Sequence, residues 1–301
     1  MIIQHTYGEP LPLTREQYVY SKILLSYEGN GPDHRILLLM KGNGMGDDIH
    51  AMPVVWQKVQ DGYDVAVVGR EFTKECFTSI GAKFIPEKEA YIGWWREQLN
   101  DYGTIYSLNE WCISHDEDTG GFIEHDRFTQ LARILDTTVP ASFSWQDFLG
   151  ATVEPTDYTV LALESSSQFR TYHRDREIKR GIHGKVVECK SGSHATFRDI
   201  IETVSKAKQV VAVDNGILNL ALALGVPVVG VFGPTDERMI AQPFSRFHAI
   251  EFQAVRKFSM PYCQTPCSFQ DARGYGEHCA NYAECMRAVL PQDILRCTNA
   301  H

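Results

Sequence analysis

Short, continuous runs of apolar residues alternate along this chain with segments of helical periodicity. The first run is Ile36–Met40 (ILLLM), and Asp64–Val68 (DVAVV) follows after one helix-like segment. Continuous apolar runs of about four to eight residues are typical of strands that are buried on both faces of a parallel sheet. Strands that alternate with helices form right-handed βαβ units. The alternation therefore predicts an α/β protein built around parallel sheets.

This alternation occurs twice, on either side of a proline-containing segment that resembles a linker, Thr152–Asp157. The first half predicts strands at Ile36–Met40, Asp64–Val68, Lys83–Ile85 and Tyr102–Leu108, and helices at Asp47–Gln60, Phe72–Ile80 and Arg127–Leu135. The second half predicts strands at Tyr158–Leu163, Lys185–Cys189, Gln209–Val213 and Val226–Phe232, and helices at Phe197–Lys206 and Leu218–Ala223. We therefore predict an N-terminal extension (1–34) and two Rossmann-like domains (35–152 and 153–301), the second with a cysteine-rich C-terminal segment.

The overall composition excludes several classes of protein. Of the 301 residues, 44% are hydrophobic and 22% are charged, unlike collagen, coiled coils or disordered chains. The net charge of −9 argues against a protein that binds nucleic acid without regard to sequence. No apolar run approaches the roughly 18–20 residues of a membrane helix, and Met1–Pro10 lacks the apolar core of a signal peptide. We therefore expect a cytoplasmic protein without a membrane span.

A glycine-rich turn, Lys41–Gly46, joins the first predicted strand to the first predicted helix. Its glycines alternate, so the turn is neither the dinucleotide fingerprint G-x-G-x-x-G nor a Walker A loop. Glycine allows the close approach of a ligand, which makes Gly44 and Gly46 candidate binding residues. Asp47 follows at the predicted helix N-terminus, where the helix dipole stabilises negative charge. The alternative is a tight turn that Asp47 merely caps.

Two further loops follow consecutive strands in the second half. Asp214–Gly216 ends one strand and begins a helix, whose N-terminal amide groups suit a diphosphate. Gly233–Asp236 follows the next strand. Ligands of open α/β sheets bind at the carboxyl ends of the strands. The two loops therefore predict an anion-binding site, and the alternative for each is an ordinary strand-to-helix connection.

Together these motifs resemble the heptosyltransferase-like glycosyltransferases of family 9, which have the GT-B fold. The matching segments are Met45–Pro53, Asp214–Ala221, Ala223–Pro227 and Phe232–Asp236, and the cysteine-rich tail is also similar. The resemblance extends from about residue 36 to residue 295. It implies an α/β GT-B fold of two Rossmann-like βαβ domains, with the active site in the interdomain cleft.

The resemblance also implies an activity and roles for individual residues. A sugar would pass from a nucleotide-diphospho-sugar, bound by the second domain, to an acceptor hydroxyl, with inversion and without a catalytic metal. Asp47 matches the family's catalytic aspartate and would act as the general base. The leaving diphosphate gains negative charge and needs fixed donors. The candidate nucleotide-sugar-binding residues are Gly44, Gly46, Arg170, Arg174, Glu188, Asp214, Asn215, Gly216, Asn219, Gly233, Pro234, Thr235 and Asp236.

Arg170 and Arg174 come from the densest basic stretch of the chain, residues 170–190. In the family, a lysine or arginine after the first strand of this domain contacts the phosphates, and the alternative is a solvated basic helix face. Glu188 ends the next predicted strand and could accept a hydrogen bond from a ribose hydroxyl. The alternative is a strand-end carboxylate without a ligand.

The chain departs from the family pattern at two places. The family usually has Asp-Thr-Gly followed three residues later by histidine, whereas this chain has Asn215 and then Asn219. An amide carries no positive charge, so diphosphate binding would be weaker or the donor preference altered. Asp48 stands beside Asp47 where the family commonly has an apolar residue. His50 is a less favoured candidate base, and its alternative role is helix packing.

The C-terminal segment is rich in cysteine. The spacing of Cys263, Cys267, Cys279 and Cys285 could hold tetrahedral zinc or iron in a structural site. Some family members that modify proteins resemble this segment and carry iron on such cysteines. The alternatives are reduced thiols in a packed loop and, less favoured without a secretion signal, disulfides.

Two functions other than transfer are open. One is a GT-B module that binds a nucleotide sugar without turnover, which Asn219 suggests. The other is a GT-B nucleotide-sugar epimerase, which needs no acceptor. For a transferase, the acceptor could be a glycan, a protein or a modified nucleobase, and the sequence names neither the donor base and sugar nor the oligomeric state.

Overall fold

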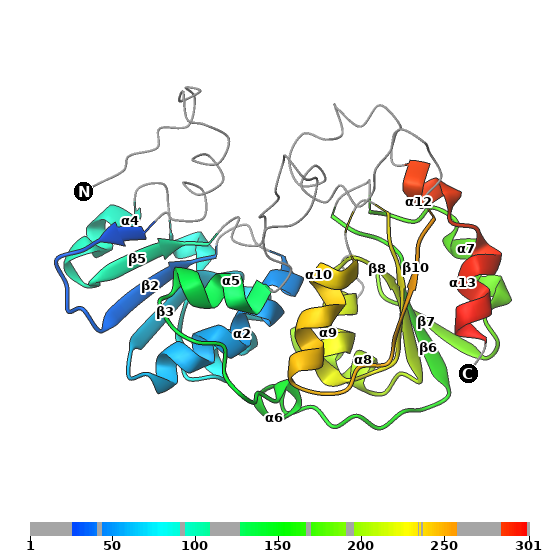
Figure 1. The fold of residues 1–301 in the computed structure, drawn as a ribbon, viewed down its shortest axis with the longest axis horizontal. Coiled ribbons are helices and arrows are strands. Elements are labelled where there is room, and N and C mark those ends of the chain that lie inside the picture. Colours follow the sequence, from blue (N-terminus) through cyan, green and yellow to red (C-terminus); the bar gives the residue numbers. More distant parts are fainter. Residues whose placement is uncertain are drawn as a thin grey trace. The chain divides into compact units, whose positions relative to one another are not determined.

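The computed structural model describes residues 26–40, 44–90, 94–108, 127–166, 170–190, 196–233, 235, 237–257 and 284–299. The chain divides into two compact units, Met1–Ala141 and Ser142–His301. Each unit contains a five-stranded sheet with helices packed against it (Figure 1). In the ranges given, the helices are all too short or too polar to span a bilayer.

The sheet of the first unit is parallel except at one edge. Its strands are β1 (Ser26–Glu28), β2 (Arg35–Leu39), β3 (Asp64–Gly69), β4 (Lys83–Pro86) and β5 (Thr104–Ser107). They lie in the order β1-β5-β2-β3-β4, and β1 runs antiparallel to β5. The described helices and turns are α2 (Met45–Gln60), η1 (Glu71–Thr73), α3 (Glu75–Thr78), η2 (Glu87–Glu89), α4 (Trp94–Glu97), η3 (Gln98–Asn100) and α5 (Arg127–Ile134).

The sheet of the second unit is parallel in every pair that the structure describes. Its strands are β6 (Tyr158–Ala162), β7 (Lys185–Glu188), β8 (Gln209–Val213), β9 (Val228–Val231) and β10 (Phe252–Val255), in the order β10-β9-β8-β6-β7. Its helices and turns are α6 (Trp145–Leu149), α7 (Asp175–Gly181), α8 (Phe197–Ser205), α9 (Gly216–Leu224), α10 (Glu237–Ala241), η4 (Gln242–Arg246), α12 (Glu284–Ala288) and α13 (Pro291–Thr298).

Helices cover both faces of this second sheet. The helices α8, α9 and α10 lie on one face, and α7, α12 and α13 lie on the other (Figure 1). The central strand β8 is buried along its whole length because both faces are covered. Alternate residues point to opposite faces, so Val211 and Val213 pack in one core cluster with Ile178 of α7, Met286 of α12 and Ile294 of α13.

The structure confirms the predicted fold class, and each predicted strand is present to within two residues at either end. The predicted helix Phe72–Ile80 is instead two short elements, η1 and α3. Thr73 explains the break, because its hydroxyl bonds to Asp48 and approaches the Arg70 carbonyl, contacts that compete with a regular helix. The strands β1 and β10 were not predicted, since both are short, partly exposed edge strands without a continuous apolar run.

The second compact unit begins before the predicted linker, and it includes residues 142–152. The helix α6 belongs to it because Gln146 Nε2 donates to the Leu224 carbonyl of α9 at 2.7 Å. The buried Trp145 also packs against Phe244, with ring centroids 5.2 Å apart. These contacts tie the segment to the second sheet.

Each sheet reverses its strand order beside one central strand. In the first unit β2 lies between β5 and β3, and in the second unit β6 lies between β8 and β7. Ligands of doubly wound sheets bind outside the carboxyl ends of the strands at such a switch point. The loops after β2, β6 and β8 are therefore the positions at which to look for functional side chains.

Candidate functional site

The Asp47 carboxylate lies in the first turn of α2, directly after the central strand β2. Gly44 precedes this helix with an extended backbone, and its N–H donates to Asp47 Oδ2 at 2.8 Å. The other oxygen, Oδ1, lies 3.6 Å from Nη1 of Arg127, the first residue of α5. The Asp47 side chain is 24% exposed. The carboxylate is thus held from two sides and stays open to solvent, while Gly46 is buried in the same turn.

The neighbouring Asp48 points into the unit. It is 2% exposed, and Thr73 Oγ1 donates to its Oδ2 at 2.6 Å. Burial raises the pKa of Asp48 to about 7; the Thr73 hydrogen bond opposes this rise and the negative charge of Asp47 adds to it. A buried carboxyl group cannot reach a substrate hydroxyl. Of the two adjacent aspartates, Asp47 is therefore the one that is placed to act as a base.

His50, the less favoured candidate base, lies inside the first unit. It has no exposed surface, and its Nδ1 lies 2.9 Å from the Gly46 carbonyl oxygen. Its ring packs against Phe128 of α5, with centroids 5.6 Å apart. This environment fits the alternative of a helix-packing residue.

At the switch point of the second unit, side chains from other loops form an ion pair and hydrogen bonds with Asp214. Asp214 follows β8 and is 6% exposed. Arg170 Nη1 lies 3.0 Å from its Oδ2, and Thr235 Oγ1 donates to the same oxygen at 2.8 Å. Ser165, after β6, donates to the Asp214 carbonyl at 3.5 Å. The structure therefore brings together three predicted donor-binding residues: Arg170, Asp214 and Thr235.

Asn215 and Asn219 make hydrogen bonds that shape the same loop. Asn215 Oδ1 accepts from the Leu218 N–H at 3.0 Å and caps α9, which begins at Gly216. Its Nδ2 donates to the carbonyls of residues 162 and 164 at 2.9 Å each, which ties the loop to the end of β6. Asn219 is 3% exposed, and its Nδ2 donates to the Asn215 carbonyl at 2.8 Å. Both amides therefore support the loop from within.

Gly233 follows β9 and packs directly beneath α12. A Cβ atom at this position would lie 2.4 Å from Met286 Cγ and 3.2 Å from Cys285 Sγ. A side chain at this position would therefore require the Met286 side chain or α12 to move. The predicted site residues Pro234 and Asp236 lie outside the described residues.

One residue that the sequence analysis did not single out contacts the same loop. Arg256 follows β10, and its guanidinium donates to the carbonyl oxygens of Gly233 and Thr235. No spacing or motif marks it, because the loop that it contacts lies more than twenty residues earlier in the chain. Its position follows only from the pairing of β10 with β9.

Arg174 and Glu188 lie apart from the Asp214 network. The Arg174 guanidinium makes two hydrogen bonds of 2.7 Å to the carboxylate of Glu177, at the exposed start of α7. Glu188 Oε2 lies 3.2 Å from Lys179 Nζ. Of the two predicted arginines, the structure places only Arg170 with the other candidate donor-binding residues.

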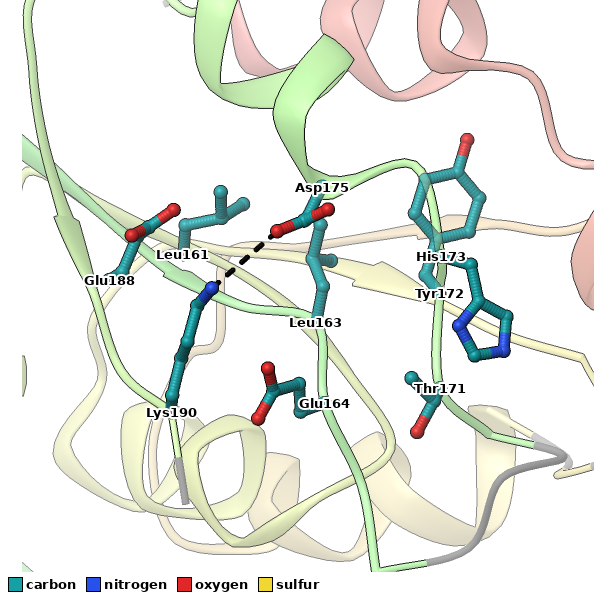
Figure 2. Close-up of a pocket in the computed structure, with 9 residues that line it drawn as sticks. All are labelled: Leu161, Leu163, Glu164, Thr171, Tyr172, His173, Asp175, Glu188 and Lys190. Carbon is teal, nitrogen blue, oxygen red and sulfur yellow. Dashed lines mark ion pairs between the residues drawn. The ribbon is translucent and has the colours of Figure 1, made fainter. Parts of the chain in front are cut away.

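A pocket of about 130 Å³ opens beside the carboxyl ends of β6 and β7 (Figure 2). Three of its carboxylates, Glu164, Asp175 and Glu188, lie around Lys190, whose Nζ is 3.6 Å from Asp175 Oδ2. Carboxylates accept hydrogen bonds from hydroxyl groups and repel phosphates. The composition of this pocket is therefore suited to a hydroxylated group such as a ribose.

The predicted metal ligands lie mostly in the part of the chain that the structure does not describe. Cys263, Cys267 and Cys279 fall in that part, whereas Cys285 belongs to α12 and is 8% exposed. Among the described residues, His, Cys, Asp and Glu form no group that could hold a metal ion.

Comparison with known proteins supports the sequence resemblance. Residues 157–269 match the family model described as glycosyltransferase family 9 (heptosyltransferase). The match begins just before β6 and extends beyond β10, so it includes the Asp214 network. No curated protein matches the sequence.

Several solved structures share the fold at low sequence identity. The dodecameric iron-containing heptosyltransferase TibC of enterotoxigenic E. coli, in complex with ADP-D-β-D-heptose, is 13% identical with a TM-score of 0.61, over 90% of this chain and 76% of that chain. The E. coli ADP-heptose LPS heptosyltransferase II is 15% identical with a TM-score of 0.52, over 88% and 98%. The E. coli heptosyltransferase WaaC with ADP is 13% identical with a TM-score of 0.50, over 73% and 92%.

At these identities the structural likeness shows the fold, which is GT-B. The family match shows that the segment with the Asp214 network is similar in sequence to this family. In its second unit this chain is therefore similar in sequence to glycosyltransferase family 9 (heptosyltransferase), and it shares the GT-B fold of solved heptosyltransferases.

Proposed function

We propose that this chain is a glycosyltransferase that moves a sugar from a nucleoside diphospho-sugar to an acceptor hydroxyl, with inversion at the anomeric carbon. The observation that carries the proposal is the buried network at Asp214, which joins Arg170 and Thr235 at the switch point of the family 9 unit. A leaving diphosphate gains negative charge and needs preorganised positive groups. The Arg170 guanidinium and the N-terminus of α9 at Gly216 supply such groups in this proposal.

The pocket beside β6 and β7 accepts the nucleoside part of the donor in this proposal. Glu164 and Glu188 offer carboxylate oxygens to ribose hydroxyls. The diphosphate and the sugar extend from this pocket toward Arg170, which binds Asp214 at the neighbouring switch point. The TibC and heptosyltransferase II structures are named for ADP-heptose, which makes ADP-heptose the first donor to test.

Asp47 is the general base in this proposal. Its carboxylate takes the proton of the acceptor hydroxyl, and the acceptor oxygen forms a bond to the anomeric carbon. The bond from that carbon to the diphosphate oxygen breaks at the same time, and its electron pair leaves with the diphosphate. One displacement of this kind inverts the anomeric configuration. The contacts from Gly44 and Arg127 keep the carboxylate aimed while it remains accessible.

We also infer a structural role for the four clustered cysteines. Four thiolates are a donor set for tetrahedral zinc or iron, and TibC is described as iron-containing. Cys285 fits such a site because its thiol is buried, and its sulfur lies beside Gly233. A metal bound there would stabilise the fold of the C-terminal segment and would take no part in the transfer.

The test compares the wild-type chain with Asp47→Asn. Calorimetric titration with ADP, GDP, UDP and CDP measures donor binding. Release of ADP from ADP-heptose, with water in place of the acceptor and with analysis of the sugar product, measures turnover. We expect the variant to bind the preferred diphosphate as the wild type does and to lose turnover. Asp61→Asn, at the exposed C-terminal end of the same helix, is the matched control and should keep both.

Four outcomes would contradict the proposal. If no nucleoside diphosphate binds the wild-type chain, the second unit does not hold this class of donor. If Asp47→Asn retains turnover, another group is the base. An isomerised nucleotide sugar as the product would instead identify an epimerase, and diphosphate binding without any turnover would favour the binding module.

A further inference from the structure

Arg256 is a buried cation that forms several hydrogen bonds with the segment after β9. Its side chain is 5% exposed. Nη1 donates to the Gly233 carbonyl oxygen at 3.2 Å, and Nη2 donates to the Thr235 carbonyl oxygen. Nη2 also lies 2.6 Å from Oε2 of Glu237, the first residue of α10. These three partners lie between the end of β9 and the first residue of α10.

The sheet explains why Arg256 meets this loop. The edge strand β10 pairs in parallel with β9, so that Val255 lies opposite Val231. The Phe232 N–H donates to the Val255 carbonyl at 3.0 Å and continues this pairing past the end of both strands. Arg256 therefore lies beside the start of the loop that follows β9. Its guanidinium also lies over the Phe232 ring, 6.0 Å from the centroid.

A buried guanidinium needs partners for its donors, and the shape of the group fixes where those partners stand. Arginine presents its N–H groups in a rigid planar fork, whereas a lysine ammonium is a single point on a flexible stem. Because Arg256 satisfies two carbonyls and one carboxylate at once, it fixes the spacing of Gly233, Thr235 and Glu237.

This spacing matters because Thr235 connects the loop to the Asp214 network. The Thr235 hydroxyl donates to Asp214 Oδ2 at 2.8 Å, and the same oxygen lies 3.0 Å from Arg170 Nη1. Thr235 is 4% exposed, so its hydroxyl has little freedom to turn toward water. A loop that moved would take Thr235 away from Asp214 and leave the Arg170–Asp214 pair with one contact fewer.

We propose that Arg256 is a positioning residue for the donor: it holds Thr235 against Asp214 and thereby keeps Arg170 in place for the diphosphate. Arg256 does not touch the donor itself. The inference rests on the proposed function, because it assigns a task within the same donor site. It differs from a purely structural role, in which Arg256 would affect folding alone.

The experiment measures ADP affinity by calorimetry and the unfolding midpoint for matched variants of the full chain. Arg256→Met removes the fork and keeps an apolar stem of similar length, and Arg256→Lys keeps the charge. Arg198→Met is the control, because Arg198 is likewise an arginine of the second unit that donates to a backbone carbonyl, that of Leu149 at the end of α6. Thr235→Val and the double variant of Arg256→Met with Thr235→Val complete the set.

We expect Arg256→Met to weaken ADP binding by about tenfold or more, which corresponds to about 1.4 kcal/mol. Arg256→Lys should fold as the wild type does and bind ADP several-fold more weakly, since one ammonium group cannot hold both carbonyls. Arg198→Met should lower the unfolding midpoint without a change in ADP affinity. The double variant should bind ADP no more weakly than whichever single variant, Arg256→Met or Thr235→Val, has the lower ADP affinity, because both substitutions break the same connection.

Three outcomes would overturn the inference. Wild-type ADP affinity in folded Arg256→Met or Arg256→Lys would show that the loop does not depend on the guanidinium. Full additivity in the double variant would show that Arg256 does not act through Thr235. A wild-type chain that binds none of the four nucleoside diphosphates would overturn the proposed function together with this inference, whereas the first two outcomes leave the proposed function standing.

Discussion

Replacing Asp48 with asparagine should change how the stability of the chain depends on pH. The pKa of Asp48 is about 7 in the folded chain against an ordinary value of 3.8, mainly because the group is buried. Asparagine keeps an oxygen that can accept the Thr73 hydroxyl, but it does not titrate. The substitution therefore removes the titration and leaves a side chain of nearly the same shape.

The sign follows from the direction of the shift. A raised carboxyl pKa means that the folded chain binds this proton more tightly than the unfolded chain does. The free energy of unfolding therefore falls as pH rises from about 4 to about 7 and stays level above that. Between pH 5 and pH 7 the folded group keeps a proton that the unfolded chain has lost, so the free energy of unfolding falls by about 1.4 kcal/mol for each of these two pH units, or about 3 kcal/mol in all. Relative to Asp48→Asn, the wild type should lose that amount across this window.

Denaturant unfolding of both proteins at pH 5, 6, 7 and 8 measures the difference. Asp61→Asn is the control, because hydrogen bonds from Thr137 and Gln57 lower the pKa of Asp61. The stability that Asp61 contributes is present above the unfolded pKa and is lost as pH falls, so it is level between pH 5 and pH 8. If the difference between the wild type and Asp48→Asn changes by less than about 1 kcal/mol across the window, the buried carboxyl group is ionised throughout and the reasoning is wrong.

Three further predictions concern side chains in both units. Thr73→Val removes the hydroxyl that donates to Asp48 Oδ2. The free energy of unfolding should therefore fall by about 1–3 kcal/mol, and its pH dependence should move to higher pH. An unchanged pH profile would argue against that hydrogen bond. Gly233→Ala forces a Cβ into Met286 and should lower the unfolding free energy by about 1–3 kcal/mol; a midpoint equal to that of the wild type would show that α12 yields freely. Elemental analysis of protein purified under reducing conditions should find close to one zinc or iron ion per chain, and the metal content should be lower in Cys285→Ser. A metal-free wild type of undiminished stability would refute the metal site.

The sequence could predict the strands of both sheet centres because burial on two faces leaves a continuous apolar run. β2 and β8 are of this kind, and both were predicted. The same reasoning cannot find β10, in which only Val255 is buried. The sequence pattern also predicted one helix at Phe72–Ile80. Helical periodicity does not reveal that the Thr73 hydroxyl donates to Asp48 on another element.

For the candidate site, the sequence predicted which loops meet but not which side chains touch. Parallel strands end at one edge, so the loops that hold Asp214 and Thr235 had to be neighbours, and a 2.8 Å hydrogen bond joins them. The choice between Arg170 and Arg174 needed coordinates, because the basic stretch offers both and only Arg170 turns toward Asp214. Arg256 acts through backbone carbonyls, which carry no residue-specific pattern.

The contact between Gly233 and α12 has a consequence for the order in which the protein is made. Gly233 packs against Met286 and Cys285, and Met286 also belongs to the apolar cluster beneath the strands of the second sheet. A nascent chain that has emerged only as far as β10 already contains every candidate donor-binding residue, yet it lacks α12, against which the loop at Gly233 packs. Because α12 comes from a later part of the sequence, the chain should acquire donor binding only after the second sheet has been synthesised. A chain stalled before α12 should be unable to bind the donor.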